Sequence, residues 1–259
     1  MKLFDSHCHL NDEKFNEDRE ELILKLNNEG VEKLVTAGYS LESSKESINL
    51  ANRYNFIYAT IGISPNDIPD NINGIKEEID QLNELYRTSE KIVAVGEIGL
   101  DYHWNTENKD LQRYAFIEQI KLANKLELPI QIHTRDAVMD TIDILKTNDV
   151  KCGGIFHCCP FNRELVKEGL KLGFYISFAG PTTFKNSKNA SEIINMVPDD
   201  RLLVETDSPY LSPEPYRGKR NDPRKVQYIL MKIAEVKGRT FEEVQNMAYE
   251  NAKRIFRIK

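Results

Sequence analysis

The sequence contains no run of apolar residues long enough to cross a membrane. A transmembrane helix needs about 20 consecutive, mostly apolar residues, and no window of the 259 residues approaches that pattern. The segment Met1-Lys2-Leu3-Phe4-Asp5 leads straight into an expected strand and lacks the apolar stretch of an export signal. We therefore expect a cytoplasmic protein that does not enter the membrane.

Cysteines are few, and basic residues are outnumbered by acidic ones. The four cysteines are Cys8, Cys152, Cys158 and Cys159, and in a cytoplasmic protein we expect them to be reduced thiols. The net charge is −6 at pH 7, so the overall field of the protein repels polyanions. A nucleic-acid substrate would therefore need a local cluster of basic side chains.

Short apolar runs alternate with longer stretches of helical periodicity along the whole chain, which is the pattern of βα units and a parallel sheet. Strands are expected at 3–10, 33–38, 57–63, 92–98, 129–133, 154–158, 174–178 and 202–207. Helices are expected at 14–28, 41–54, 75–88, 110–126, 137–147, 163–172, 190–197, 223–237 and 242–256, the last of them capped by Thr240.

Eight such units in about 250 residues predict an α/β fold, a (β/α)₈ TIM barrel. The rival is a doubly wound open sheet, which usually has a glycine-rich turn after its first strand. The turn here is Leu10-Asn11-Asp12, without glycine. No linker or low-complexity tract divides the chain, so we expect residues 1–259 to form a single domain.

Four of the five histidines fall at the ends of expected strands. His7 and His9 close the first strand, where alternation places both imidazoles on one face. His133 and His157 close the fifth and sixth strands. Because the carboxyl ends of barrel strands meet at one face, these imidazoles predict a divalent-metal site rather than ordinary strand-end histidines.

Carboxylates occupy equivalent positions at the ends of other strands. Glu97 closes the fourth strand, and Glu205-Thr206-Asp207 closes the eighth. Four imidazoles and two carboxylates exceed the needs of one tetrahedral zinc ion, whereas two metals about 3.5–4 Å apart that share a carboxylate would use them all. The alternative for Glu97 is a buried acid neutralised by lysine or arginine, but no basic residue stands at a matching strand end.

The remaining histidine and the cysteines are expected to lie outside the ligand set. His103 follows the fourth strand, and we expect it to pack on Trp104. Alternation along the strands should turn Cys8 and Cys158 towards the helices, where they would pack as small apolar residues. Cys159 shares the face of His157 and is the cysteine that could reach the site.

Five segments together resemble the TatD family of metal-dependent deoxyribonucleases in the amidohydrolase superfamily. They are Asp5-Ser6-His7-Cys8-His9-Leu10, Val95-Gly96-Glu97-Ile98-Gly99-Leu100-Asp101-Tyr102, Ile132-His133-Thr134-Arg135-Asp136-Ala137, Leu203-Val204-Glu205-Thr206-Asp207-Ser208-Pro209-Tyr210-Leu211 and Arg217-Gly218-Lys219-Arg220-Asn221. The resemblance implies two divalent cations such as zinc, manganese or magnesium. His7, His9, Glu97 and Asp207 would hold one, and Glu97, His133 and His157 would hold the other.

The same resemblance implies an exonuclease that acts on DNA ends, with Glu97 and Asp207 as the catalytic carboxylates. Asp207, a ligand with a free oxygen, could accept a proton from the attacking water. We expect a monomer without an obligate protein partner. The alternatives are a hydrolase of a small amide, lactone or phosphoester, a deacylase of misacylated transfer RNA, and a non-catalytic metal-binding protein.

Candidate substrate-binding residues lie in the loops around the expected site: Arg135, Glu205, Arg217, Lys219 and Arg220. Arg135 could neutralise a phosphate, or it could form a surface ion pair with Asp136 or another neighbour. The basic loop after the eighth strand could hold DNA or could simply cap the barrel.

The chain departs from the family pattern in two loops at the expected mouth of the site. Ser64 stands where the family usually has histidine, and Cys158-Cys159-Pro160 replaces the usual turn after the sixth strand. The metal ligands are unaffected by either change, so the resemblance supports the metal centre more directly than the choice of substrate.

Overall fold

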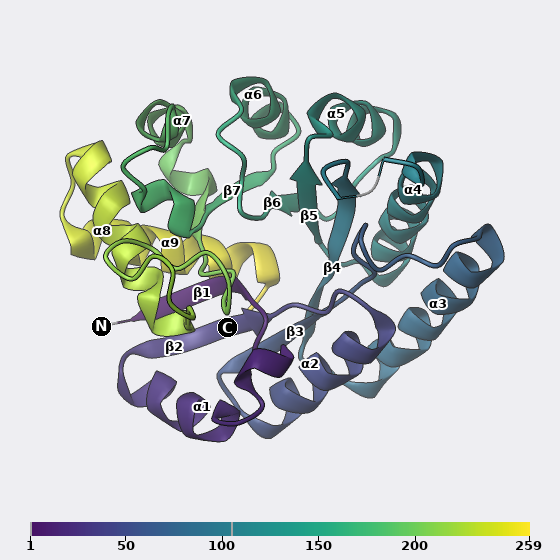
Figure 1. Cartoon of the computed structure of the whole chain (residues 1–259), viewed down its shortest axis with the longest axis horizontal. Helices are drawn as coiled ribbons and strands as arrows, with labels where there is room; N and C mark the ends of the chain where they lie inside the picture. Colours follow the sequence, from purple (N-terminus) through teal and green to yellow (C-terminus); the bar gives the residue numbers. More distant parts are fainter. Residues whose placement is uncertain (1, 105) are drawn as a thin grey trace.

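The fold is a single sheet of eight parallel strands, paired in chain order and ringed by helices (Figure 1). The structure is a computed structural model that describes residues 2–104 and 106–259. The strands are β1 (Leu3–Cys8), β2 (Val31–Thr36), β3 (Ile57–Ile61), β4 (Ile92–Asp101), β5 (Ile130–Arg135), β6 (Gly154–Phe156), β7 (Tyr175–Phe178) and β8 (Leu202–Val204). This arrangement confirms the predicted (β/α)₈ barrel.

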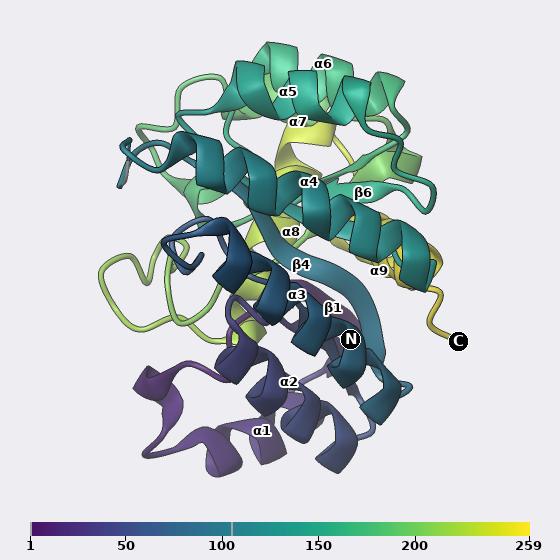
Figure 2. The same ribbon diagram turned by 90° about the vertical axis from the view of Figure 1, so that its right-hand side faces the viewer.

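Helices cover the outer face of the barrel. They are α1 (Arg19–Asn28), α2 (Leu41–Arg53), α3 (Ile72–Leu85), α4 (Lys109–Leu126), α5 (Val138–Thr147), α6 (Arg163–Lys171), α7 (Ala190–Met196), α8 (Val226–Lys237) and α9 (Phe241–Phe256). Short 3₁₀ turns occur at Glu13–Phe15, Tyr86–Thr88, Gly180–Thr183, Asp199–Arg201 and Pro223–Lys225. Figure 2 shows α4 lying across β4 from outside. Within the described part of the chain, no helix is both long and apolar enough to span a membrane.

Several predicted elements differ from the structure at their ends. The helix expected at 14–28 is divided, because Asp12 caps a 3₁₀ turn at Glu13–Phe15 through its side chain and α1 begins only at Arg19. The strands expected at 3–10, 154–158 and 202–207 end early, at Cys8, Phe156 and Val204. The predicted strand ends therefore leave the sheet and build the loops of the site.

The seam between β8 and β1 is closed by hydrogen bonds beyond the end of β8. The backbone N–H of Asp207 donates to the carbonyl of His7 at 3.0 Å, and that of His9 donates to the carbonyl of Ser208 at 2.7 Å. The buried Asp5 carboxylate accepts from the backbone N–H of Thr206 at 2.8 Å. These bonds hold the end of β1 beside the segment that carries Asp207.

A bulge in β4 determines where Glu97 points. All ten residues of β4 are buried, and its register with β5 shifts between Val95 and Ile98. Bulges of this kind change the direction of a side chain and occur next to active sites. The backbone N–H of Glu97 donates to the carbonyl of Gly38 at 2.6 Å instead of continuing a regular ladder.

Gly99 on β4 lies too close to β5 for any side chain. Its φ is +138°, and a Cβ there would lie 2.0 Å from the carbonyl oxygen of His133. We expect Gly99→Ala to lower the free energy of unfolding by about 2–4 kcal/mol, because both strain and overlap result. Gly173→Ala is the control: its φ is +78° with no atom within 4 Å, so only about 1 kcal/mol should be lost. Urea denaturation that ranks the two variants equally would contradict the packing argument.

Candidate metal centre

The predicted metal ligands come together at the carboxyl ends of the strands. His7 lies on β1, Glu97 on β4 and His133 on β5, whereas His157 follows β6 and Asp207 lies beyond β8. His9 comes directly after β1. All of these side chains are largely buried. The parallel barrel thus converts positions far apart in sequence into one cluster.

One set of ligand atoms surrounds the first part of this cluster. The Nε2 atoms of His7 and His9 are 3.2 Å apart. They lie 3.5 and 3.6 Å from Oε2 of Glu97, and 3.6 and 3.2 Å from Oδ1 of Asp207. The ligand atoms of His7, His9 and Asp207 lie close enough together to share one cation, with Oε2 of Glu97 beside both imidazoles.

A second set lies on the other side of the same carboxylate. Oε1 of Glu97 is 2.9 Å from Nδ1 of His133 and 3.4 Å from Nε2 of His157. These two nitrogens are 3.1 Å apart. Glu97 therefore directs a different oxygen to each set, as a carboxylate between two metals would.

Hydrogen bonds determine which ring nitrogen of His7 keeps a lone pair that could bind a metal. Gln131 on β5 donates through its Nε2 to the carbonyl of Ser6 at 2.7 Å, so its oxygen faces Nδ1 of His7 at 3.0 Å. Nδ1 must then carry the proton, which leaves a lone pair on Nε2. Nδ1 of His9 lies 3.3 Å from the carbonyl of Ala37 and has the same role.

The histidines of the second set are oriented by carboxylates. Nε2 of His133 lies 3.1 Å from Oδ2 of Asp101, and Nδ1 of His157 lies 3.2 Å from Oε1 of Glu205. With those nitrogens donating, Nδ1 of His133 and Nε2 of His157 present lone pairs towards each other. Lone pairs this close repel unless a cation lies between them, so both sets fit divalent metals.

The electrostatics of the cluster keep its carboxylates ionised. Burial raises the pKa of Glu97, but when protons occupy the facing imidazole nitrogens in place of cations, the charge of His157 and the hydrogen bonds from His133, His157 and His7 hold that pKa well below its usual range. Burial also raises the pKa of Asp207, but when a proton occupies Nε2 of His9 in place of a cation, its hydrogen bond and charge, together with the charges of His157 and His7, lower that pKa below its usual value. Burial also opposes ionisation of Asp101, yet the hydrogen bond from His133 lowers its pKa to about 2. Ionised carboxylates beside imidazoles are the ligands a divalent cation requires.

Sequence reasoning missed the residues that orient these ligands. Gln131 stands two residues before His133, so strand alternation alone places both on one face of β5. Asp101 closes β4 within the segment 95–102, which resembles the TatD family, but the sequence alone did not predict its contact with His133. A buried amide and a strand-end carboxylate beside histidines are signals that could have identified both.

Replacing Asp101 tests whether orientation of His133 matters for metal binding. Asp101→Asn removes the charge that His133 faces, and we expect metal affinity at the second set to fall about 10- to 100-fold. Asp140→Asn is the matched control, since Asp140 bonds to Tyr102 at 2.7 Å and Arg113 at 2.8 Å, outside the metal cluster. Calorimetric metal titration of both variants decides the point. Equal affinities would show that Asp101 does not orient the ligand.

Glu205 lies beneath the site rather than at its opening. Its side chain has no exposed surface, and Oε1 accepts both from His157 and from the backbone N–H of Cys158 at 2.7 Å. Its predicted contact with substrate stays a prediction, whereas its contact with His157 is part of the structure. His103 packs edge-on against Trp104, with ring centroids 4.9 Å apart, as expected.

The prediction for Cys158 was wrong. Cys158 lines the central cavity together with Cys159. The strand ends at Phe156, and the positive φ of Cys158, +38°, breaks the alternation on which the prediction depended. Cys8 is fully buried in the core as expected.

An open cavity of about 800 Å³ leads to the cluster. His9, Glu97, His133, His157 and Asp207 line it, which leaves the ligands accessible to a small molecule. Arg135 is the one lysine or arginine among the described residues that line it. In the described part of the chain Arg135 forms no ion pair with Asp136, which instead accepts a hydrogen bond from His103 at 3.0 Å.

The predicted basic loop lies outside this cavity. Arg220 donates to Asp18 at 2.8 Å and to the carbonyl of Lys14 at 2.7 Å. Arg217 lies over the ring of Phe184, 4.2 Å from its centroid. Arg217 and Lys219 form no ion pair within residues 2–104 and 106–259. Arg220 is therefore held in an ion pair, whereas Arg217 contacts only the ring of Phe184 and Oδ1 of Asn186, at 3.4 Å, within the described residues.

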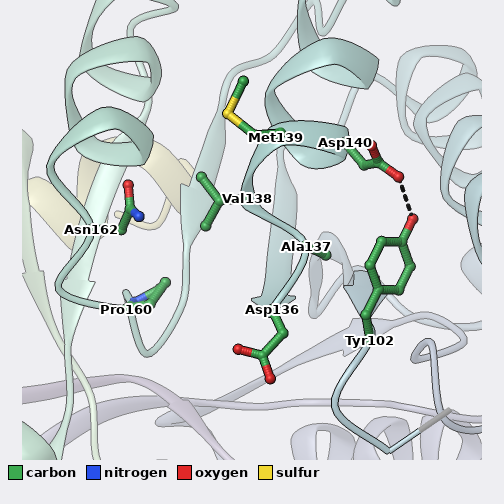
Figure 3. A pocket seen from close by; sticks show the side chains of 8 residues that line it. All are labelled: Tyr102, Asp136, Ala137, Val138, Met139, Asp140, Pro160 and Asn162. Carbon is green, nitrogen blue, oxygen red and sulfur yellow. Dashed lines mark hydrogen bonds between the residues drawn. The ribbon is translucent and has the colours of Figure 1, made fainter. Parts of the chain in front are cut away.

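A second, smaller pocket lies beside the main cavity (Figure 3). It measures about 470 Å³ and shares Pro160 with the main cavity. Figure 3 shows Asp136 at one side and the hydrogen bond between Tyr102 and Asp140 at another. None of the predicted metal ligands is among its described lining residues.

The family profile described as "TatD related DNase" matches residues 4–257. This chain belongs to the TatD family. A Bacillus subtilis relative described as the uncharacterized metal-dependent hydrolase YabD is 46% identical over 257 residues, which is 99% of each chain. Another relative, the uncharacterized metal-dependent hydrolase YcfH of Escherichia coli, is 37% identical over 262 residues, which is 100% of this chain and 97% of its own length.

Solved structures of similar fold agree with this assignment. The TatD homologue YjjV of Escherichia coli matches with a TM-score of 0.92 at 26% identity, over 99% of this chain and 98% of its own. An amidohydrolase from Saccharomyces cerevisiae matches with a TM-score of 0.88 at 18% identity, over 98% and 99% of the two chains, and supports the fold alone. The TatD family, its relatives and the ligand cluster agree on a metal-dependent hydrolase.

Proposed function

We propose that the protein is a deoxyribonuclease that removes nucleotides from DNA ends with two divalent cations. The observation that carries this proposal is the position of Glu97, whose two oxygens face separate ligand sets at the floor of an open cavity. Two cations so placed would activate water and polarise a phosphoryl oxygen. His7, His9, Glu97 and Asp207 would hold one cation, and Glu97, His133 and His157 the other.

The protein's own residues would divide the remaining work. Asp207 is ionised and reaches the cavity, so it can accept a proton from the attacking water. Arg135 lies on the cavity wall and can form charge-assisted hydrogen bonds with a phosphate. A cavity of about 800 Å³ suits a chain end rather than a continuous duplex.

The proposal is tested by measuring which members of a panel of substrates the purified protein hydrolyses. Purified protein is loaded in turn with zinc, manganese or magnesium and is given single-stranded DNA, duplex DNA, RNA, a nitrophenyl phosphodiester, a lactone and a small amide. We expect stepwise shortening of DNA from one end. Hydrolysis of the lactone or amide without any cleavage of DNA would overturn the proposal.

A second candidate is a hydrolase of a small phosphoester. It is favoured by the position of the basic loop, because Arg217, Lys219 and Arg220 lie outside the cavity and Arg220 is paired with Asp18. A small phosphoester would need Arg135 and the metals but no further cations. A requirement for the basic loop therefore distinguishes a nuclease from a hydrolase of small phosphoesters.

We expect the double variant Arg217→Ala/Lys219→Ala to cleave oligonucleotides less efficiently and with a weaker dependence on salt. Each lost phosphate contact should flatten the slope of log(kcat/KM) against log salt by roughly 0.7 for a single strand. Turnover of a nitrophenyl phosphodiester should persist. Lys25→Ala/Arg87→Ala removes the same charge from helical ion pairs and is the control. An unchanged slope would identify the loop as a barrel cap.

A further inference from the structure

Trp104 is exposed to solvent at the cavity, although a tryptophan side chain is usually buried. It is the one tryptophan in the sequence, and 71% of its surface is accessible to solvent. Tryptophan is usually well buried because its large apolar surface is costly to expose. Its side chain lines the same cavity as the metal ligands.

The loop that carries Trp104 is held in place rather than free. Oδ1 of Asp101 accepts from the backbone N–H groups of His103 at 2.9 Å and Trp104 at 3.3 Å. His103 meets the indole edge-on and is itself hydrogen-bonded to Asp136. The same Asp101 carboxylate faces His133, so the position of the indole is linked to that of a metal ligand.

Arg135 and Trp104 together form a surface that has an aromatic ring beside a positive charge. Its guanidinium lies 5.3 Å from the centroid of the Trp104 ring, yet most of the indole remains exposed. A flat aromatic group can therefore still stack on the indole. The guanidinium beside it can bind a phosphate at the same time.

Of the other aromatic side chains that line the cavity, Tyr39 and Phe161 are half-buried, and the exposed Tyr210 is less available. Tyr210 donates through its hydroxyl to Asp12 at 2.7 Å, and Nζ of Lys14 lies 4.0 Å from its ring centroid. Both its polar end and its ring are thus engaged. Among the described lining residues, Trp104 with Arg135 is the better site for a planar group.

We infer that Trp104 and Arg135 form a nucleotide subsite, in which the indole stacks on a nucleobase and the guanidinium binds its phosphate. This inference deepens the proposed nuclease function and rests on it. Base stacking on aromatic side chains tolerates any sequence, because every base has a flat face. The subsite would recognise a terminal nucleotide by its base without selecting which base it is.

The first test uses the fluorescence of Trp104 in the wild-type protein, which reports on this site alone. Zinc-loaded protein is titrated with thymidine 5′-monophosphate and, separately, with deoxyribose 5-phosphate, which has no base. We expect saturable quenching by the nucleotide and none by the sugar phosphate. Equal responses to the two probes, or no response to either, would overturn the inference.

The second test compares oligonucleotides that end in a normal or an abasic nucleotide, with the abasic residue placed at either end. We expect the wild type to show a KM about tenfold lower for the terminus with a base. Trp104→Ala should abolish that preference, while Trp104→Phe should keep part of it. Leu24→Ala removes a similarly exposed apolar side chain on α1 and should keep the whole preference. A preference that survives in Trp104→Ala overturns the subsite.

The two proposals fail in different ways. If the wild type binds thymidine 5′-monophosphate with quenching but cleaves no oligonucleotide, the subsite stands and the nuclease function fails. If the wild type degrades DNA but neither quenching nor terminal preference depends on the base, the nuclease function stands and the subsite fails.

Discussion

Replacing Glu97 with alanine is expected to remove at least one metal equivalent and to reduce turnover by about a thousandfold or more. The reason is that its two oxygens face separate ligand sets, at 3.5 Å from His7 and 2.9 Å from His133. Losing several kcal/mol of transition-state stabilisation corresponds to a change of this size. Glu97→Gln should also impair metal binding, because glutamine keeps the shape of the side chain but loses its negative charge.

Metal analysis of the purified Glu97 variants decides this prediction, alongside turnover of the best substrate in the panel. His103→Ala is the control for metal content, since it removes an imidazole that lies outside both ligand sets. It should retain all of its metal. Two retained equivalents and unchanged turnover in Glu97→Ala would refute the assignment of a shared carboxylate.

Replacing Asp207 with asparagine is expected to lower kcat by roughly a hundred- to ten-thousandfold, the range typical of a lost general base. The asparagine keeps the shape of the side chain but can neither stay ionised nor accept the proton. Metal binding should weaken at the set that contains His7 and His9, whose Nε2 atoms lie 3.6 and 3.2 Å from Asp207. The set formed by His133 and His157 should keep its metal.

A two-phase metal titration combined with kcat measurement separates these effects. Asp200→Asn is the matched control, because Asp200 is an exposed carboxylate that pairs with Arg201 before β8. It should have normal metal content and activity. If Asp207→Asn keeps its kcat within tenfold of the wild type, another group must accept the proton.

The candidate ligands come from the ends of five different strands. The effects of replacing Glu97 or Asp207 therefore depend on which of the two ligand sets each residue faces. A substitution of Glu97 affects both sets, because its two oxygens face them both, whereas a substitution of Asp207 affects the set that contains His7 and His9. Asp101 extends this coupling outwards, because one oxygen faces His133 and the other holds the loop with Trp104. The candidate metal centre and the proposed nucleotide subsite are thus connected through a single side chain.

The sequence by itself determined the barrel and predicted which residues its strand ends would bring together as candidate metal ligands. The alternation of apolar strands and helical stretches specifies eight βα units, and a parallel barrel must bring the carboxyl ends of its strands together. His7, His133 and Glu97 could therefore be grouped without coordinates. Their chemistry then predicted a divalent-metal site.

Only the tertiary structure decided what surrounds those ligands. Which nitrogen of His7 is free depends on Gln131 across the barrel, and the direction of Glu97 depends on a bulge that periodicity does not reveal. The pairing of Arg220 with Asp18 joins residues 202 positions apart. Local pattern predicts which face of a strand a residue occupies, but hydrogen-bond partners and loop positions depend on contacts between distant segments.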